Sequence, residues 1–164
     1  MMRESAVALL SMLTTVALST VDPDTVRQSQ DFVTRAAIAS RYQLEAGELA
    51  RDRGSERTRT FAARIVDDHR TSQRELARLA REQGLWLPSD LDADHRAALA
   101  RLATANGVAF DREYADQQLR AHADDVELFE RESSNGRDTE LRAFATDSLP
   151  LLEGQLQRAE DLPR

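Results

Sequence analysis

Apolar residues recur at intervals of three and four along four long segments of the chain, and this spacing is typical of amphipathic helices. The predicted helices cover residues 25–53, 56–83, 108–133 and 139–161. Ser55 is placed to cap the second helix, and Gly84 and Gly136 are placed to end the second and third. No segment shows the period-two alternation of a strand. The pattern therefore predicts an all-α fold.

The connection between the second and third long helices is itself informative. It runs from Gly84 to Gly107, begins with an apolar Trp86-Leu87 pair that we expect to plug the end of the core, and contains a short amphipathic helix over residues 92–105. That helix is about 20 Å long at ~1.5 Å per residue, so the connection can run the length of a bundle. Two helical hairpins joined by one long crossover form the ferritin-like variant of the four-helix bundle. Pro150 lies inside the last helix and is expected to kink it.

Composition narrows the possible functions. The chain has 164 residues and a net charge of −7, and its 22 basic residues, all arginine, alternate with acidic residues along the helices. A nucleic-acid partner is therefore not expected, because it would require clustered positive charge. The absence of cysteine excludes thiol chemistry and disulfides. No nucleophile elbow or glycine-rich phosphate loop occurs, so no substrate is evident and an enzyme is not favoured.

The N-terminal segment resembles a secretory signal peptide. A short charged start precedes an apolar run over residues 6–18, and Ala17 and Ser19 have the spacing that signal peptidase reads. We therefore expect a signal-like segment over residues 1–19, a linker over 20–30 and a helical bundle over 31–161. The corresponding location is secreted or the bacterial cell envelope.

Polar residues interrupt the apolar stripe near the middle of each long helix: Gln43, His69, His122 and Gln155. His69 and His122 each lie about 20 Å from both ends of their helices, at ~1.5 Å per residue, so the two imidazoles should be level in the bundle. Two facing imidazoles could bind a divalent transition metal, form hydrogen bonds in the core, or respond to pH.

Carboxylate ligands are harder to find. Di-iron bundles place a glutamate three residues before each histidine, and Val66 and Leu119 occupy those positions here. Asp68 and Asp125 flank the stripes and could reach inward, although acids at the edge of an apolar stripe more often face water. A carboxylate-bridged dinuclear centre is therefore not predicted.

A second acidic motif is explained by helix capping. Asp90, Asp92 and Asp94 alternate as in a calcium loop, but His95 and Arg101 stand where an EF-hand requires glycine and a bidentate carboxylate. We expect these acids to cap and charge the start of the short helix, with His95 on the surface.

Four blocks of sequence resemble a known bacterial family. They are "FVTRAAIASRYQLEAGELA", "FAARIVDDHRTSQRELARLAREQGLWLP", "GVAFDREYADQQLRAH" and "LRAFATDSLPLLEGQL", which together cover about residues 31–159. In order and spacing they are similar to the ferritin-like family called domain of unknown function 4142. The resemblance implies an exported or envelope-associated bundle in which inward Glu and His residues have suggested metal binding, without a defined activity.

Carried over residue by residue, the resemblance assigns His69 and His122 to the two family histidines. Gln43 falls where the family usually has glutamate, and Gln155 falls where it usually has histidine. An amide oxygen is a weak ligand for first-row transition metals. We therefore expect a non-enzymatic bundle with a structural or interaction role, a degenerate metal site and no cofactor, acting with an unknown protein partner or by self-association. The alternative is a metal-binding protein whose His-based site holds a divalent transition metal at low affinity for redox or metal handling.

Overall fold

The computed structural model describes residues 22–163, which form five helices and no strand within that range. The helices are α1 (Pro23–Arg53), α2 (Glu56–Glu82), α3 (Ala93–Thr104), α4 (Gly107–Asn135) and α5 (Thr139–Glu160). The predicted all-α fold is confirmed, and each predicted helix is present. The signal-like segment over residues 1–19 lies outside the described residues.

The helix ends follow the local sequence. Ser55 caps α2 as predicted, with its side chain accepting a hydrogen bond from the Thr58 amide. Asp22 caps α1 and Pro23 occupies its first turn, where a missing amide hydrogen costs nothing. This pair starts α1 at residue 23, so residues 23–30 of the predicted linker are helical instead. The α5 helix continues through Pro150.

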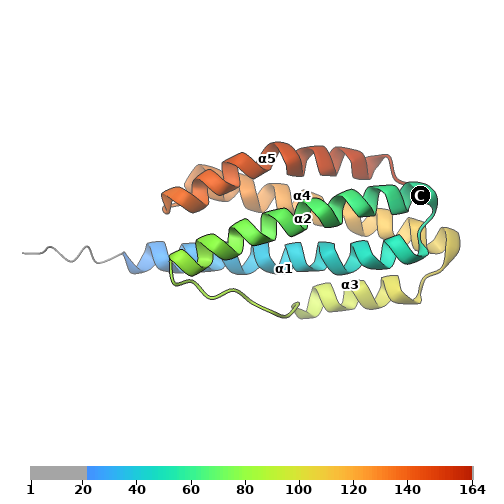
Figure 1. Cartoon of the computed structure of the whole chain (residues 1–164), viewed down its shortest axis with the longest axis horizontal. Coiled ribbons are helices and arrows are strands. Elements are labelled where there is room, and N and C mark those ends of the chain that lie inside the picture. The colour runs from blue at the N-terminus through green and yellow to red at the C-terminus, as the bar shows by residue number, and fades with distance from the viewer. Residues whose placement is uncertain (1–21, 164) are drawn as a thin grey trace, which may run out of the picture.

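The long helices form two hairpins, with α1 packed along α2 and α4 packed along α5 (Figure 1). The crossover leaves the end of α2, runs back along the bundle through α3 and reaches the start of α4 at the opposite end (Figure 1). Confirming the predicted crossover, α3 packs against α1 and α4.

The start of the crossover is fixed by its backbone. The Gln30 side chain accepts a hydrogen bond from the Trp86 amide at 2.9 Å and donates one to its carbonyl at 2.7 Å. Because these bonds hold the Trp86 backbone against α1, the indole points away and is 65% exposed. The prediction that Trp86 plugs the core is therefore wrong. The half-buried Leu87, its partner in the predicted pair, does pack against the core.

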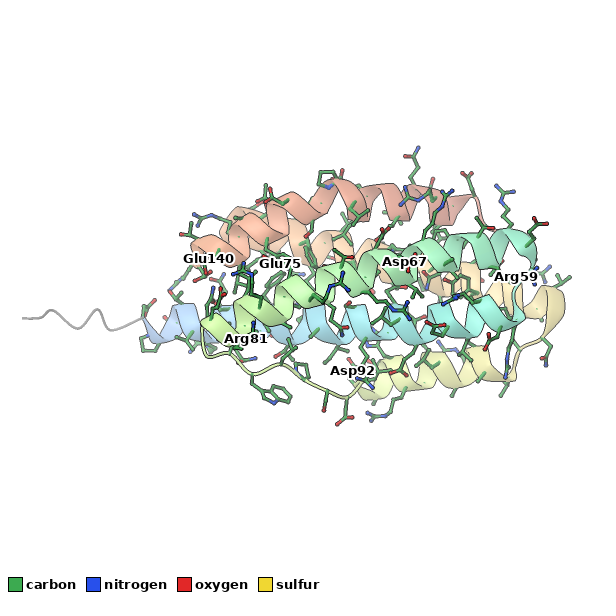
Figure 2. The ribbon with its side chains drawn as sticks, viewed as in Figure 1. Arg59, Asp67, Glu75, Arg81, Asp92 and Glu140 are labelled. Carbon is green, nitrogen blue, oxygen red and sulfur yellow. The ribbon has the colours of Figure 1, made fainter. Side chains whose placement is uncertain are left out.

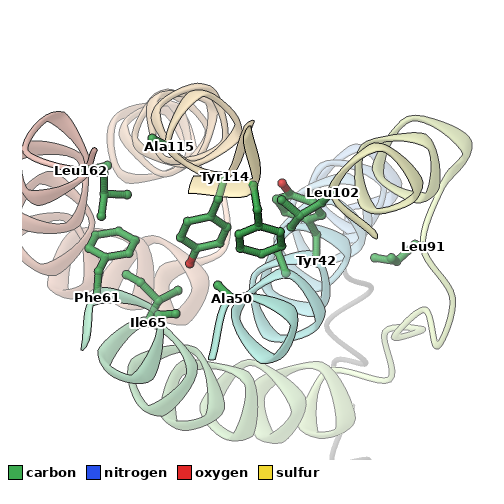
Figure 3. Close-up of a cluster of buried hydrophobic side chains, with 13 residues drawn as sticks. Tyr42, Ala50, Phe61, Ile65, Leu91, Leu102, Tyr114, Ala115 and Leu162 are labelled. Carbon is green, nitrogen blue, oxygen red and sulfur yellow. The ribbon is translucent and has the colours of Figure 1, made fainter. Parts of the chain in front are cut away.

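The core consists of two apolar clusters at different heights of the bundle. One cluster includes Tyr42, Phe61, Ile65, Phe110 and Tyr114 (Figure 3). The other lies toward the start of α1 and includes Phe32, Leu76, Phe129, Leu141 and Leu152. Among residues 22–163, no helix combines the length and apolar character that crossing a bilayer requires.

Candidate metal centre

A layer of buried polar side chains separates the two apolar clusters. Its members come from all four long helices and are each at most 6% exposed: Gln43, His69, Gln118, His122, Asp125 and Gln155. Many of their polar atoms have no hydrogen-bond partner among the described residues. Leaving a buried polar group unpaired typically costs about 1–3 kcal/mol, so a layer of this kind is costly unless something else satisfies it.

The two histidines meet at the predicted level. The centroids of the His69 and His122 rings are 6.2 Å apart. His69 Nδ1 lies 3.4 Å from Ser40 Oγ, whereas His69 Nε2 and both ring nitrogens of His122 lack a partner among the described residues. The Phe61 ring meets His122 edge-on at 6.1 Å and closes one side of the site.

Burial keeps both imidazoles neutral. It lowers the pKa of His69 to about 4. It also lowers the pKa of His122 to about 3, with smaller contributions from His69 and Arg158. Neutral imidazole is the form that binds metals, so these histidines need release no proton to act as ligands near neutral pH.

Asp125 supplies a carboxylate beside the histidines. The expectation that acids flanking the stripe face water is wrong for this residue, which is 4% exposed. Burial raises the pKa of Asp125 to about 7; the nearby Gln43 amide opposes this shift, and Asp124 adds to it. No Gln43–Asp125 contact meets hydrogen-bond geometry, and Oδ2 of Asp125 has no partner among the described residues.

His69, His122 and Asp125 together form a compact donor set. One ligand atom from each lies within 4.8 Å of the other two. Ligands of a single ion stand roughly 3–4 Å apart when metal–ligand bonds are about 2.0–2.1 Å, so small side-chain rotations would bring the three atoms into range. Two imidazoles and one carboxylate with positions left open suit a mononuclear divalent transition metal.

The two glutamines at the family positions occupy the same layer but differ in their contacts. Gln43 lies against Asp125, and both of its amide atoms lack a partner among the described residues. Gln155 donates from Nε2 to Asp68 Oδ2 at 3.0 Å, while its Oε1 has no such partner. Gln118, one helical turn before His122, is not part of the predicted site but is fully buried here too.

The third histidine lies elsewhere. His95 Nδ1 is 2.7 Å from Asp92 Oδ1, and the His95 backbone amide donates to the same oxygen. Asp92 therefore caps α3 as predicted. The His95 side chain is half-buried and packs against the Tyr42 ring at 5.0 Å, so it is less exposed than expected.

Comparison with known proteins agrees with this architecture. A DUF305 fragment from Deinococcus radiodurans, solved by crystallography, matches the chain with a TM-score of 0.72 and 16% identity, covering 85% of this chain and 95% of that one. At that identity the likeness concerns the fold alone, and it supports the predicted ferritin-like bundle. No curated protein sequence matches the chain. The model of the domain of unknown function DUF4142 matches residues 15–162, and the chain therefore belongs to the DUF4142 family.

Proposed function

We propose that this protein binds one divalent transition-metal ion through His69, His122 and Asp125. The observation that carries the proposal is the convergence of these buried donor atoms within 4.8 Å of one another. Two of the side chains are neutral imidazoles, and burial favours protonation of the third unless a cation compensates its charge. A bound cation would satisfy all three at once.

The donor set favours a mononuclear centre over a carboxylate-bridged pair of ions. Within the buried layer Asp125 is the one carboxylate, and the amides of Gln43, Gln118 and Gln155 fill the neighbouring positions. Bridged di-iron sites in bundles use four carboxylates. A single ion with open coordination positions is suited to metal handling or redox chemistry.

The competing role is a structural or interaction bundle whose metal site has been lost. The residues at two family ligand positions favour it, because Gln43 and Gln155 carry amides, whose oxygens bind first-row transition metals weakly. With either role, we propose that the protein is secreted or exported to the cell envelope, because the segment over residues 1–19 resembles a signal peptide.

Metal titration of the purified protein separates the two roles. After treatment with a chelator, the protein is titrated with Co(II), Zn(II), Fe(II), Mn(II) or Cu(II), and bound metal and melting temperature are measured. The proposal predicts one ion per chain, with visible Co(II) absorption bands from imidazole coordination. A metal concentration 100-fold above the dissociation constant should stabilise the fold by about 2.7 kcal/mol.

The chain offers a matched control. The His69→Ala/His122→Ala double variant should lose the bound metal and the thermal shift, whereas His95→Ala should keep both, because His95 pairs with Asp92 outside the layer. Circular dichroism checks that each variant is folded. Absence of stoichiometric metal from the wild-type protein, or its persistence in the double variant, would support the structural role instead.

A further inference from the structure

A groove between α2 and α5 connects the protein surface with the buried polar layer. Its volume is about 570 Å³, and residues of its inner end include His69, Asp125 and Gln155. Its walls are apolar, with contributions from Leu76, Leu79, Phe144 and Leu152. His122 is not among the lining residues, so an ion entering from this side would meet His69 and Asp125 first.

The outer part of the groove is acidic. Its exposed acidic residues are Glu75 of α2 and Glu140 and Asp147 of α5. Figure 2 labels Glu75 on α2 and Glu140 at the start of α5. Arg78 also lines the groove, but it forms ion pairs with Glu75 at 2.6 Å and with Glu82. Unbalanced negative charge beside low-dielectric walls concentrates cations and repels anions.

Two oxygen donors lie deeper in the groove than this acidic mouth, beside the proposed ligands. Asp68 is half-buried and accepts a hydrogen bond from Gln155 Nε2 at 3.0 Å. This bond fixes the Gln155 amide so that Oε1, which is buried and unpartnered among the described residues, is its remaining acceptor. Exposure decreases from the surface carboxylates to the half-buried Asp68 and then to the buried Gln155, so a cation moving inward would meet them in that order.

We propose that the α2–α5 groove is the entry route for the divalent cation, with Asp68 and Gln155 forming a transit site on the way to His69, His122 and Asp125. The inference rests on the proposed metal site. It gives Gln155 a role in loading the ion without making it a ligand in the final complex. Asp68 acts on the rate of loading, because it attracts the ion without remaining bound to it.

Rapid-mixing measurements of Co(II) binding to the metal-free full-length protein test this route. Asp68→Asn should lower the association rate constant by about threefold or more, because it removes a charge from the path, and should make that rate less sensitive to salt. The dissociation rate should fall in parallel, leaving the dissociation constant within about twofold. A permanent ligand would instead change the dissociation constant.

The neighbouring acid is the control. Asp67 is the next residue along α2, so its side chain lies about 100° further round the helix. It is exposed, pairs with Arg70 at 3.9 Å and does not line the groove. Asp67→Asn therefore makes the same charge change one residue away and should leave the rate close to that of the wild type. As a second variant, Ala143→Trp would narrow the groove from α5 and should slow both association and dissociation.

The outcomes distinguish the two proposals. If Co(II) binds and is lost in the His69→Ala/His122→Ala variant, the metal site stands, and unchanged rates in Asp68→Asn and Ala143→Trp overturn the entry route alone. Equal slowing by Asp67→Asn and Asp68→Asn would likewise overturn it, since a general surface charge would then explain the effect. If the wild-type protein binds no Co(II), the metal site and its entry route fail together.

Discussion

Asp125 follows His122 by three residues on α4, and the two buried side chains face His69 of α2 as one donor set. Three residues turn a helix through about 300°, which returns the carboxylate to nearly the same face as the imidazole. The acid and the base therefore share one environment, and burial affects them in opposite directions. It raises the pKa of Asp125 to about 7 and lowers the pKa of His122 to about 3.

Metal affinity should depend on pH through Asp125 and not through the histidines. Below about pH 7 the metal-free protein carries a proton on Asp125 that a cation must displace, whereas His69 is neutral down to about pH 4. The affinity for Co(II) should therefore rise about tenfold per pH unit between pH 5.5 and 6.5 and level off above pH 7. Isothermal titration across this range measures the slope.

The Asp125→Asn variant is the matched test of that slope. It should bind Co(II) more weakly, with an affinity nearly independent of pH between 5.5 and 7, because no displaceable proton remains on residue 125. If the affinity of this variant for Co(II) still rose about a hundredfold per pH unit, the pH dependence would come from deprotonation of His69 and His122, which would contradict the prediction.

The stability of the metal-free protein should depend on pH in opposite ways through the two histidines and through Asp125. Each histidine has a pKa below its unfolded value of 6.5, so its contribution to stability is complete above pH 6.5 and is lost as pH falls toward about 4. Asp125 has a pKa above its unfolded value of 3.8, so its contribution is lost as pH rises toward about 7. Near pH 5, unfolding should take up about two protons at the histidines and release about one from Asp125.

Urea unfolding in the presence of a chelator measures that balance. In the wild-type protein the free energy of unfolding should rise with pH around pH 5. Its slope should include the equivalent of about one proton taken up on unfolding by His69, His122 and Asp125 together. In Asp125→Asn this slope should correspond to about two protons, because only the two histidines then contribute and the opposing titration of Asp125 is absent. Surface carboxyls are common to both proteins, so equal slopes in the two would show that Asp125 is ionised in the native state.

Restoring the family ligands should strengthen the site. Gln43→Glu would place a second carboxylate against Asp125, and Gln155→His would add a third imidazole at the inner end of the groove. Together they should raise metal affinity at least tenfold, about 1.4 kcal/mol. Competition with a chromophoric chelator measures the gain. Gln117→Glu is the control, because Gln117 is also buried but accepts a hydrogen bond from Tyr42 outside the layer.

A close approach of α1 to α2 should be sensitive to a single methyl group. A Cβ at Gly47 would lie 2.5 Å from Cγ2 of Val66, so Gly47→Ala should destabilise the protein by about 1–3 kcal/mol. In the Val66→Ala background the same change should cost less, since the clashing methyl is absent. Thermal unfolding of the four proteins gives the coupling energy, and additive effects would contradict the proposed contact.

Gly154→Ala is the matched control for that experiment. There the nearest atom to a new Cβ is the end of the flexible Arg158 side chain at 3.3 Å. Alanine is favoured over glycine inside a helix by about 1 kcal/mol, so this variant should be neutral or slightly more stable.

The architecture could be predicted because local chemistry determines where the helices begin and end. The apolar stripes show the helices, Ser55 and Gly84 mark the boundaries of α2, and the length of the crossover requires two separate hairpins. The side chain of Trp86 could not be predicted this way. Its exposure depends on hydrogen bonds between its backbone and Gln30, 56 residues away in the sequence.

The site could be predicted only in part. The positions of His69 and His122 within their helices predicted that the two rings are level, and their centroids are 6.2 Å apart. Asp125 was harder to assign because both Asp125 and Val126 fit the spacing between His122 and Phe129. Val126 is the more apolar of the two residues, yet it is half-buried and Asp125 is buried. The rotation of α4 that decides between them depends on its packing against other helices, and the groove beside α5 likewise has no local signal.

The separation of the donors between the two hairpins has a consequence for assembly. His69 belongs to the hairpin of α1 and α2, whereas His122 and Asp125 belong to the hairpin of α4 and α5. Neither half of the chain alone contains the set, so a bound ion would act as a noncovalent crosslink between the halves. Metal supply would then regulate how often the two hairpins separate, and the bundle would be held closed most firmly when metal is abundant.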